Sequence, residues 1–362
     1  MKLPFHSFEP TFFAGLLDDP LLWLRVRPWG RSLLVDCGQL QHLAKRVVRS
    51  IDAVFVSHAH MDHFMGMDNL VRQIHVAPRT LSIFGPPGLA SRLAHKLAGY
   101  DWNLCEEHWC TLRLTEVHPE HLEVFECRGA EGFGCRPTGS LPRGEGAIYA
   151  NRYLQVKAAL CDHLLPVLTL RLEEVPGFAV DPDRLAAVGL APGPWLQELK
   201  RLFIREKLIG TTLAVPRAGE GAATAEWRDA GELYRQIVAR REPASIGYLT
   251  DVGFTAENLT TILQLLTGVT LLVCECSFLA ADREKARASW HLCSSDLNLL
   301  LEELRPQFVL PMHLSKGYLR RTAQLYQELQ PPAGTTVLRL PDHVAPRPLL
   351  PREVPPPGPF QR

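Results

Sequence analysis

The stretch that decides the fold of this chain reads Ser57-His58-Ala59-His60-Met61-Asp62-His63, directly after the apolar run Asp52–Val56. Side chains two positions apart on an extended segment point to the same side, so His58 and His60 can reach one metal ion. Asp62 and His63 lie past the predicted strand end, on the turn into a helix, and can face a second ion. Imidazole and carboxylate groups together suit Zn²⁺. Because four polar side chains after a buried strand need partners, we expect a metal site here rather than a solvated turn.

Composition restricts the class of protein. The chain has 362 residues, 46% hydrophobic and 22% charged, which is typical of a globular protein with a large core. The formal net charge is +0, so any surface that binds nucleic acid must be local. Met1–Pro20 lacks the pattern of a signal peptide, and the chain has no apolar run of about 18 residues. We therefore expect a cytoplasmic protein without a membrane segment, whose nine scattered cysteines are reduced thiols.

Strands and helices alternate along most of the chain, which predicts a layered α/β fold. We expect one domain over residues 1–340, an inserted segment at about 176–225 whose part Arg217–Ala225 is loose, and an extended or disordered Pro-rich tail at 341–362. The predicted strands are Leu21–Arg27, Ser32–Asp36, Ala53–Ser57, Leu81–Phe84, Val167–Leu172, Ile246–Thr250, Thr270–Glu275, Phe308–Met312 and Thr336–Leu340, and the whole stretch Thr111–Glu173 is expected to be mostly strand. The predicted helices are Met65–Val76, Leu89–Leu97, Pro182–Val188, Pro194–Phe203, Ala256–Leu266, Ser294–Leu304 and Leu319–Leu329.

Further candidate metal ligands follow later predicted strands. His163 follows Ala158–Cys161, while Asp251 and His313 each stand directly after a predicted strand. Ligands gather at such carboxyl ends of strands in α/β proteins. A lone histidine at a strand end is more often a capping or surface residue. These three residues are therefore candidate metal ligands only in combination with the His58–His63 motif.

The metal motif and three other segments resemble a known family. The HxHxDH pattern of His58–His63 is similar to that of the metallo-β-lactamase superfamily. Leu33–Gly38, Phe64–Leu70 and Phe84–Leu89 resemble its ribonuclease Z branch, endonucleases that trim the 3′ ends of precursor tRNA. The resemblance implies an αββα sandwich, in which two mixed β-sheets pack together, helices cover the outer faces and the metals lie at one edge.

The resemblance also implies a dinuclear site. Zinc suits these ligands best, and Mn²⁺ or Fe²⁺ would accept them too. The implied ligands are His58, His60 and His163 for one ion and Asp62, His63 and His313 for the other. Asp251 would bridge the ions, and Asp62 would also orient or deprotonate the attacking water. His291 stands at the place of a histidine that donates a proton to the leaving oxygen, and Glu275 matches a glutamate that supports the site from outside.

The inserted segment resembles the arm with which ribonuclease Z grips the tRNA elbow. The similarity rests on Val175–Phe178 and Pro192–Lys200. It implies sequence-independent contacts to RNA phosphates from Lys200, Arg201, Arg205 and Lys207. The charges alone fit a solvated amphipathic helix as well, and that alternative stays open.

The chain departs from the family where substrate is held. Gly317 stands in place of the family's arginine, which leaves Ser315 and Lys316 as candidate substrate contacts. A lysine cannot replace the two-pronged grip of arginine on phosphate. RNA, with precursor tRNA in particular, is the expected substrate; a small phosphodiester, lactone or thioester is the alternative, and a non-catalytic binding scaffold is another. The family is often homodimeric.

Four cysteines lie between the metal motifs, at Cys105, Cys110, Cys127 and Cys135. They could hold a structural zinc, with His118 and His121 nearby as further ligands or as parts of an ordinary strand turn. Their spacing differs from that of zinc ribbons, so buried free thiols are the favoured interpretation.

Overall fold

The computed structural model describes residues 3–144, 146–216, 225–239 and 242–344. The chain divides into two compact units. The main unit comprises Met1–Glu174 together with Ala244–Arg362, and the insert unit comprises Val175–Pro243.

The first sheet of the main unit has eight strands that follow one another in chain order. Its central strands β3 to β6 run parallel, and the strands on either side pair antiparallel. The strands are β1 (Phe8–Phe12), β2 (Leu22–Val26), β3 (Arg31–Val35), β4 (Ile51–Phe55), β5 (Thr80–Gly85), β6 (Thr111–Val117), β7 (His121–Arg128) and β8 (Cys135–Pro142).

The second sheet has seven strands in the order β17-β16-β15-β14-β11-β10-β9. β14 to β17 run parallel, and β9 to β11 form an antiparallel part that joins them through β11. The strands are β9 (Tyr149–Ala150), β10 (Leu154–Asp162), β11 (Pro166–Glu174), β14 (Ser245–Leu249), β15 (Leu271–Glu275), β16 (Phe308–Met312) and β17 (Thr336–Val337).

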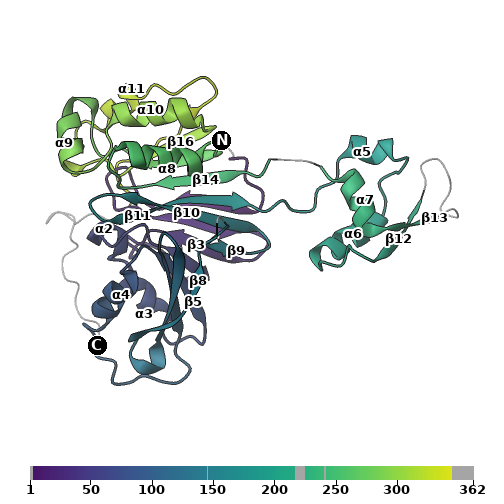
Figure 1. The fold of residues 1–362 in the computed structure, drawn as a ribbon, viewed down its shortest axis with the longest axis horizontal. Coiled ribbons are helices and arrows are strands. Elements are labelled where there is room, and N and C mark those ends of the chain that lie inside the picture. Colours follow the sequence, from purple (N-terminus) through teal and green to yellow (C-terminus); the bar gives the residue numbers. More distant parts are fainter. Residues whose placement is uncertain (1–2, 145, 217–224, 240–241, 345–362) are drawn as a thin grey trace, which may run out of the picture. The chain divides into compact units, whose positions relative to one another are not determined.

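Helices cover the outer face of each sheet, which gives the predicted αββα sandwich (Figure 1). On the first sheet lie α1 (Lys45–Ser50), α2 (Met61–Phe64), α3 (Met67–Ile74) and α4 (Leu89–Leu97). On the second lie α8 (Ala256–Leu266), α9 (Arg283–Ala288), α10 (Ser294–Leu304) and α11 (Thr322–Glu328). Every helix in the described part of the chain is too short or too polar to span a bilayer.

The two-residue repeat of the central strands divides them between two cores. Leu34 and Val54 pack against the helices, while their neighbours Leu33 and Phe55 pack against the second sheet. Tyr248, from that second sheet, belongs to the same core between the sheets. Because successive side chains of a strand point to opposite faces, strands buried on both faces read as continuous apolar runs.

The insert unit has its own apolar core. Its elements are α5 (Pro182–Ala187), α6 (Trp195–Ile204), β12 (Thr212–Pro216), β13 (Ala225–Asp229) and α7 (Ala230–Ile237). Leu199 from α6, Val215 from β12 and Leu233 from α7 meet in that core. Asp181 caps α5 by accepting hydrogen bonds from the backbone N–H groups of Asp183 and Arg184. Most of the segment expected to be loose, residues 217–224, lies outside the described residues.

Several predicted elements need correction. β1, α1, α9 and the insert elements β12, β13 and α7 were not predicted; β1 and α1 are short segments that lack a clear apolar repeat. The expected strand Thr336–Leu340 keeps only its first two residues, and the expected helix Leu319–Leu329 begins at Thr322 after a 3₁₀ turn, Lys316–Tyr318. Of the predicted tail, the carbonyls of Pro341 and Asp342 accept backbone hydrogen bonds at 2.8 and 3.1 Å. Residues 345–362 lie outside the described ranges.

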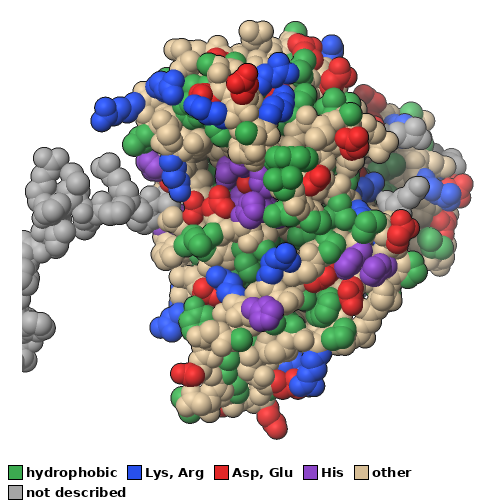
Figure 2. Space-filling model, turned by 60° about the vertical axis from the view of Figure 1, so that its left-hand side comes forward, with side chains coloured by type: hydrophobic (Ala, Val, Ile, Leu, Met, Phe, Trp, Pro, Cys, Tyr) green, Lys and Arg blue, Asp and Glu red, His purple; other side chains and the backbone are tan. Residues whose placement is uncertain are grey.

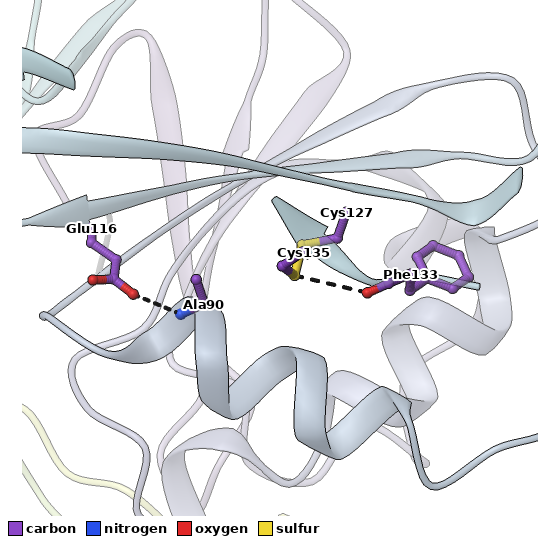
Figure 3. The surroundings of a disulfide bond; sticks show 5 residues. All are labelled: Ala90, Glu116, Cys127, Phe133 and Cys135. Carbon is purple, nitrogen blue, oxygen red and sulfur yellow. Dashed lines mark hydrogen bonds between the residues drawn. A yellow bond between two sulfur atoms is a disulfide. The ribbon is translucent and has the colours of Figure 1, made fainter. Parts of the chain in front are cut away.

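The expectation of reduced cysteines is wrong at one pair. Cys127 on β7 and Cys135 on β8 are register partners and form a disulfide (Figure 3). The tight connection between these antiparallel strands places two residues that are 8 positions apart directly opposite each other, which a search for metal spacing misses. With two of the four sulfurs bonded together, the four-cysteine zinc site is not formed, and Cys105 and Cys110 are free thiols.

Candidate metal centre

The candidate metal centre lies where strands of both sheets reach their carboxyl ends. His58 and His60 follow β4, and α2 then presents Asp62 and His63. Parallel strands end at a common edge, so side chains distant in sequence meet there. The second sheet contributes His163 from the turn after β10, Asp251 after β14 and His313 after β16.

One group at this edge comprises His58, His60, His163 and Asp251, whose ligand atoms lie within 4.8 Å of one another. Nε2 of His58 is 3.7 Å, and Nε2 of His163 is 4.0 Å, from Asp251 Oδ2. Burial, followed by the neighbouring His63, lowers the pKa of His58 to about 2. This imidazole therefore stays neutral, which is the form that binds a metal.

A second group comprises Asp62, His63 and His313, again within 4.8 Å. Nε2 of His313 lies 3.0 Å from Asp62 Oδ2, and Nε2 of His63 lies 3.7 Å from the same oxygen. Asp251 also faces this group, with Oδ2 3.4 Å from His63 Nε2 and Oδ1 3.7 Å from His313 Nδ1. Burial alone would raise the pKa of Asp251, but His313 and His63 hold it well below its usual range. Its carboxylate is therefore an ionised group that faces both clusters.

Four of the histidines are oriented through Nδ1. His63 Nδ1 donates to Asp36 at 2.8 Å, and His163 Nδ1 donates to the carbonyl of Trp290 at 2.6 Å. His58 Nδ1 lies 3.0 Å from Ser57 Oγ, and His313 Nδ1 lies 3.0 Å from Ser277 Oγ. Contacts of this kind fix the tautomer and leave Nε2 to bind a metal.

Asp36 is the residue that organises one side of the centre. It is fully buried and accepts hydrogen bonds from the N–H and hydroxyl of Ser57, at 2.7 and 2.9 Å, and from the hydroxyl of Tyr248 at 2.7 Å. With His63 as a further donor, its carboxylate is saturated. From the sequence, Asp36 is expected only as part of a strand end that resembles the family. The available signal was an aspartate at the end of an apolar strand, which needs partners when buried.

His291 and Glu275 form a pair beside the first group. Nδ1 of His291 lies 2.9 Å from Glu275 Oε2, and its ring centroid lies 4.7 Å from that of His163. Glu275 is fully buried and also accepts from the N–H of Val252 and the hydroxyl of Ser277. Burial would lower the pKa of His291, but the charge of Glu275 outweighs it and raises that pKa to about 9. His291 is therefore positively charged at neutral pH.

A cavity of about 360 Å³ opens beside Asp62, His291 and His313. On the face drawn in Figure 2, histidine side chains gather next to acidic ones in a hollow of the surface. Ser315 and Lys316 line the cavity, and Lys316 Nζ lies 3.3 Å from Asp19 Oδ1.

The basic residues predicted to hold RNA belong to the insert unit. Lys200 and Arg201 lie on α6, and Arg205 and Lys207 follow it. All four are exposed. Arg201 pairs with Glu198 at 3.0 Å, so part of its charge is already balanced.

The donor set and its contacts fit divalent cations. Nε2 of His58 and Nε2 of His63 are buried without a hydrogen-bond partner among the described residues, although an orphaned buried nitrogen is costly. Both nitrogens face the Asp251 carboxylate. Imidazole and carboxylate ligands suit zinc and similar divalent transition metals. A bound ion would therefore supply the partner that each of these two nitrogens lacks.

Comparisons with known proteins agree with this geometry. A profile of the beta-lactamase superfamily domain matches residues 31–138. Ribonuclease Z of Deinococcus radiodurans is 31% identical over 290 residues, which cover 79% of this chain and 83% of that protein. Ribonuclease BN of Cronobacter sakazakii is 27% identical over 301 residues, covering 80% and 81%. The solved metallo-beta-lactamase fold protein YhfI of Bacillus subtilis matches 92% of this chain and 97% of its own at a TM-score of 0.50 and 13% identity, which bears on the fold alone.

The αββα sandwich, with histidines and aspartates gathered at one sheet edge, defines a protein of the metallo-β-lactamase superfamily. This fold implies that the protein binds a divalent metal. Within that superfamily, the identity and length of the match to the Deinococcus protein show that the chain belongs to the ribonuclease Z family.

Proposed function

We propose that this protein is a dinuclear-metal endoribonuclease that hydrolyses a phosphodiester bond of precursor tRNA to release its 3′ trailer. The observation that carries the proposal is the Asp251 carboxylate, which faces both groups of candidate ligands, with the charged His291 beside them. Relatives that span most of this chain are named ribonuclease Z and ribonuclease BN.

The residues present would hold two divalent ions, for which zinc is best suited and Mn²⁺ or Fe²⁺ are alternatives. When bound, such ions acidify water and neutralise the charge that develops on the phosphoryl group. Asp251 would be shared between them. The remaining ligands would be His58, His60 and His163 for one ion and Asp62, His63 and His313 for the other.

Asp62 and His291 would carry the proton transfers. Asp62 borders the cavity, and its carboxylate would orient the attacking water and accept its proton. The leaving group is a ribose 3′ oxygen, a poor leaving group, so His291 would donate a proton to it from its charged form. General acid–base groups of this kind contribute roughly 10²–10⁴-fold in rate. Glu275 would keep His291 charged and turned toward the cavity.

Binding of the RNA would use two sets of residues. Ser315 and Lys316 line the cavity, where a hydroxyl and an ammonium group suit the phosphates next to the cleaved bond. The exposed basic residues of the insert unit, Lys200, Arg201, Arg205 and Lys207, would contact the RNA backbone. Such contacts read charge rather than sequence and weaken as salt is added.

Cleavage of a precursor tRNA by the purified full chain, with zinc or manganese, tests the proposal. We expect one cut after the discriminator base, and a 3′ hydroxyl on the tRNA product. D251N should abolish this cut. If the protein hydrolyses a small phosphodiester but leaves precursor tRNA intact, precursor tRNA is excluded as the substrate and the small-ester alternative gains support.

A further inference from the structure

The β6–β7 hairpin carries a square of four side chains on one face, those of Glu116, His118, His121 and Glu123. Glu116 and Glu123 are direct register partners, and the backbone N–H of His118 donates to the carbonyl of His121 at 3.0 Å to close the turn. Side chains alternate along a strand, so His118 lies on the same face as Glu116, and His121 on the same face as Glu123. Two histidines therefore stand next to two glutamates at the end of the hairpin.

The side chains of this square are in contact. The rings of His118 and His121 stack with centroids 4.4 Å apart and an angle of 11° between their planes. Nε2 of His118 lies 3.2 Å from Glu116 Oε2 and 3.6 Å from Glu123 Oε2. One ligand atom from each of His118, His121 and Glu123 lies within 4.8 Å of the others.

The charges of this square call for a cation. Carboxylates directly opposite each other on paired strands repel, and Glu116 has a side chain only 5% exposed, where screening by water is weak. The nearby Arg143 does not balance them in the described contacts, because its guanidinium donates to the carbonyls of His118 and Ala158. The position between the imidazole and the two carboxylates is therefore the one that a positive charge would occupy.

We propose that this square is a further metal site, which binds one divalent transition-metal ion of the zinc, cobalt or nickel type. His118, His121 and Glu123 are the ligands, and two imidazoles with a carboxylate are a common zinc ligand set. Glu116 supplies negative charge beside His118.

The ion stabilises the structure around the turn. Glu116 accepts hydrogen bonds from the backbone N–H groups of Gly88 and Ala90, both at 2.8 Å, at the start of α4. Figure 3 shows the bond to Ala90. A cation beside Glu116 thus joins the β6–β7 turn to the first turn of α4. None of these residues belongs to the candidate metal centre, so this site does not depend on the proposed function.

Zinc content tests the site without reference to activity. The full-length protein and the variants H121Q and E123Q are saturated with zinc, freed of excess metal and analysed for zinc per chain. H95Q serves as the matched control, because His95 is an exposed histidine of α4 whose Nδ1 lies 3.4 Å from Ser91 Oγ. The wild type and H95Q should hold one more zinc per chain than H121Q and E123Q.

A crystal of the zinc-loaded wild type locates the ion. Anomalous scattering at the zinc edge should give a peak between His118, His121 and Glu123. Equal zinc content in all four proteins, or the absence of a peak at the hairpin, overturns the proposal. Use of two variants guards against a single substitution that disturbs the fold, because E123Q retains the size of the side chain.

Discussion

Nδ1 of His291 lies 2.9 Å from a carboxylate oxygen of Glu275, and the side chain of Glu275 has no exposure to solvent. A buried carboxylate next to an imidazole favours the charged imidazolium. In the proposed reaction this contact therefore decides the protonation state of the group that donates to the leaving oxygen.

Replacement of Glu275 by glutamine should shift the pH dependence of catalysis. The pKa of His291, raised to about 9, keeps the acid protonated below that pH, and activity is lost as the pH rises through it. Without the carboxylate charge the pKa of His291 falls, by about one unit or more. The alkaline limb of kcat against pH should move to lower pH in E275Q, while activity at pH 6 is retained in large part.

H291Q provides the comparison for this prediction, because it removes the titrating group and should flatten the alkaline limb. An E275Q profile that is lower at every pH but has its limb unmoved would show that Glu275 only supports the structure, and it would separate His291 from the acid role.

The two groups of ligands predict different metal contents for two variants. Among the described residues, His60 belongs to the first group of candidate ligands and not to the second, so H60A should hold about one ion per chain fewer than the wild type. Asp251 faces both groups, so D251N should weaken both sites and, after dialysis, hold clearly more than one ion per chain fewer than the wild type. Elemental analysis measures both contents. Equal losses in the two variants would argue against a shared carboxylate.

The sequence was sufficient to place the candidate ligands but not their supports. His58, Asp251 and His313 each follow an apolar strand, which made them candidates, and the resemblance to ribonuclease Z assigned them to one site. The contacts that orient them depend on tertiary structure. The carbonyl that accepts from His163 Nδ1 belongs to Trp290, 127 positions away, and any residue type supplies a carbonyl.

The contacts of Asp36 and the disulfide are two further features that local sequence patterns could not predict. The Tyr248 hydroxyl that donates to Asp36 comes from the other sheet, 212 positions along the chain, so no local pattern reveals it. The pairing of Cys127 with Cys135 depends on the register of β7 against β8, which the spacing of cysteines does not determine. The fold class can be predicted from the alternation of strands and helices along the chain. The hydrogen-bond and disulfide partners of a residue depend on how the strands and sheets pair in the folded protein.

Charge reversal in the insert unit should weaken RNA binding and leave the chemistry intact. In a K200E/R205E variant, two exposed basic residues become acidic, so KM for precursor tRNA should rise several-fold. The slope of log affinity against log salt should become shallower by about 0.7–0.9 for each phosphate that the variant no longer neutralises. Hydrolysis of a small phosphodiester should not change. The double charge reversal K45E/R46E, at two exposed residues of α1, changes the net charge by the same amount and is the control. An equal loss in that variant would attribute the effect to net charge alone.

Introduction of an arginine at Gly317 should strengthen substrate binding. Among the residues that the structure describes, a Cβ atom added at this position meets only Ser315 Oγ, at 3.7 Å, which is ordinary van der Waals contact, so a side chain is accommodated. The position follows Lys316, whose ammonium group is drawn toward Asp19 at 3.3 Å and is only partly available to a phosphate. A guanidinium offers a two-pronged grip that an ammonium lacks, and one charge-assisted hydrogen bond contributes roughly 1.5 kcal/mol, about tenfold in affinity.

KM for precursor tRNA should therefore fall in G317R by up to about that factor, while G317A, which adds the Cβ without the charge, should leave KM as it is. A fall in both variants would assign the gain to a stiffer backbone, and no fall in G317R would place the scissile phosphate away from this wall of the cavity.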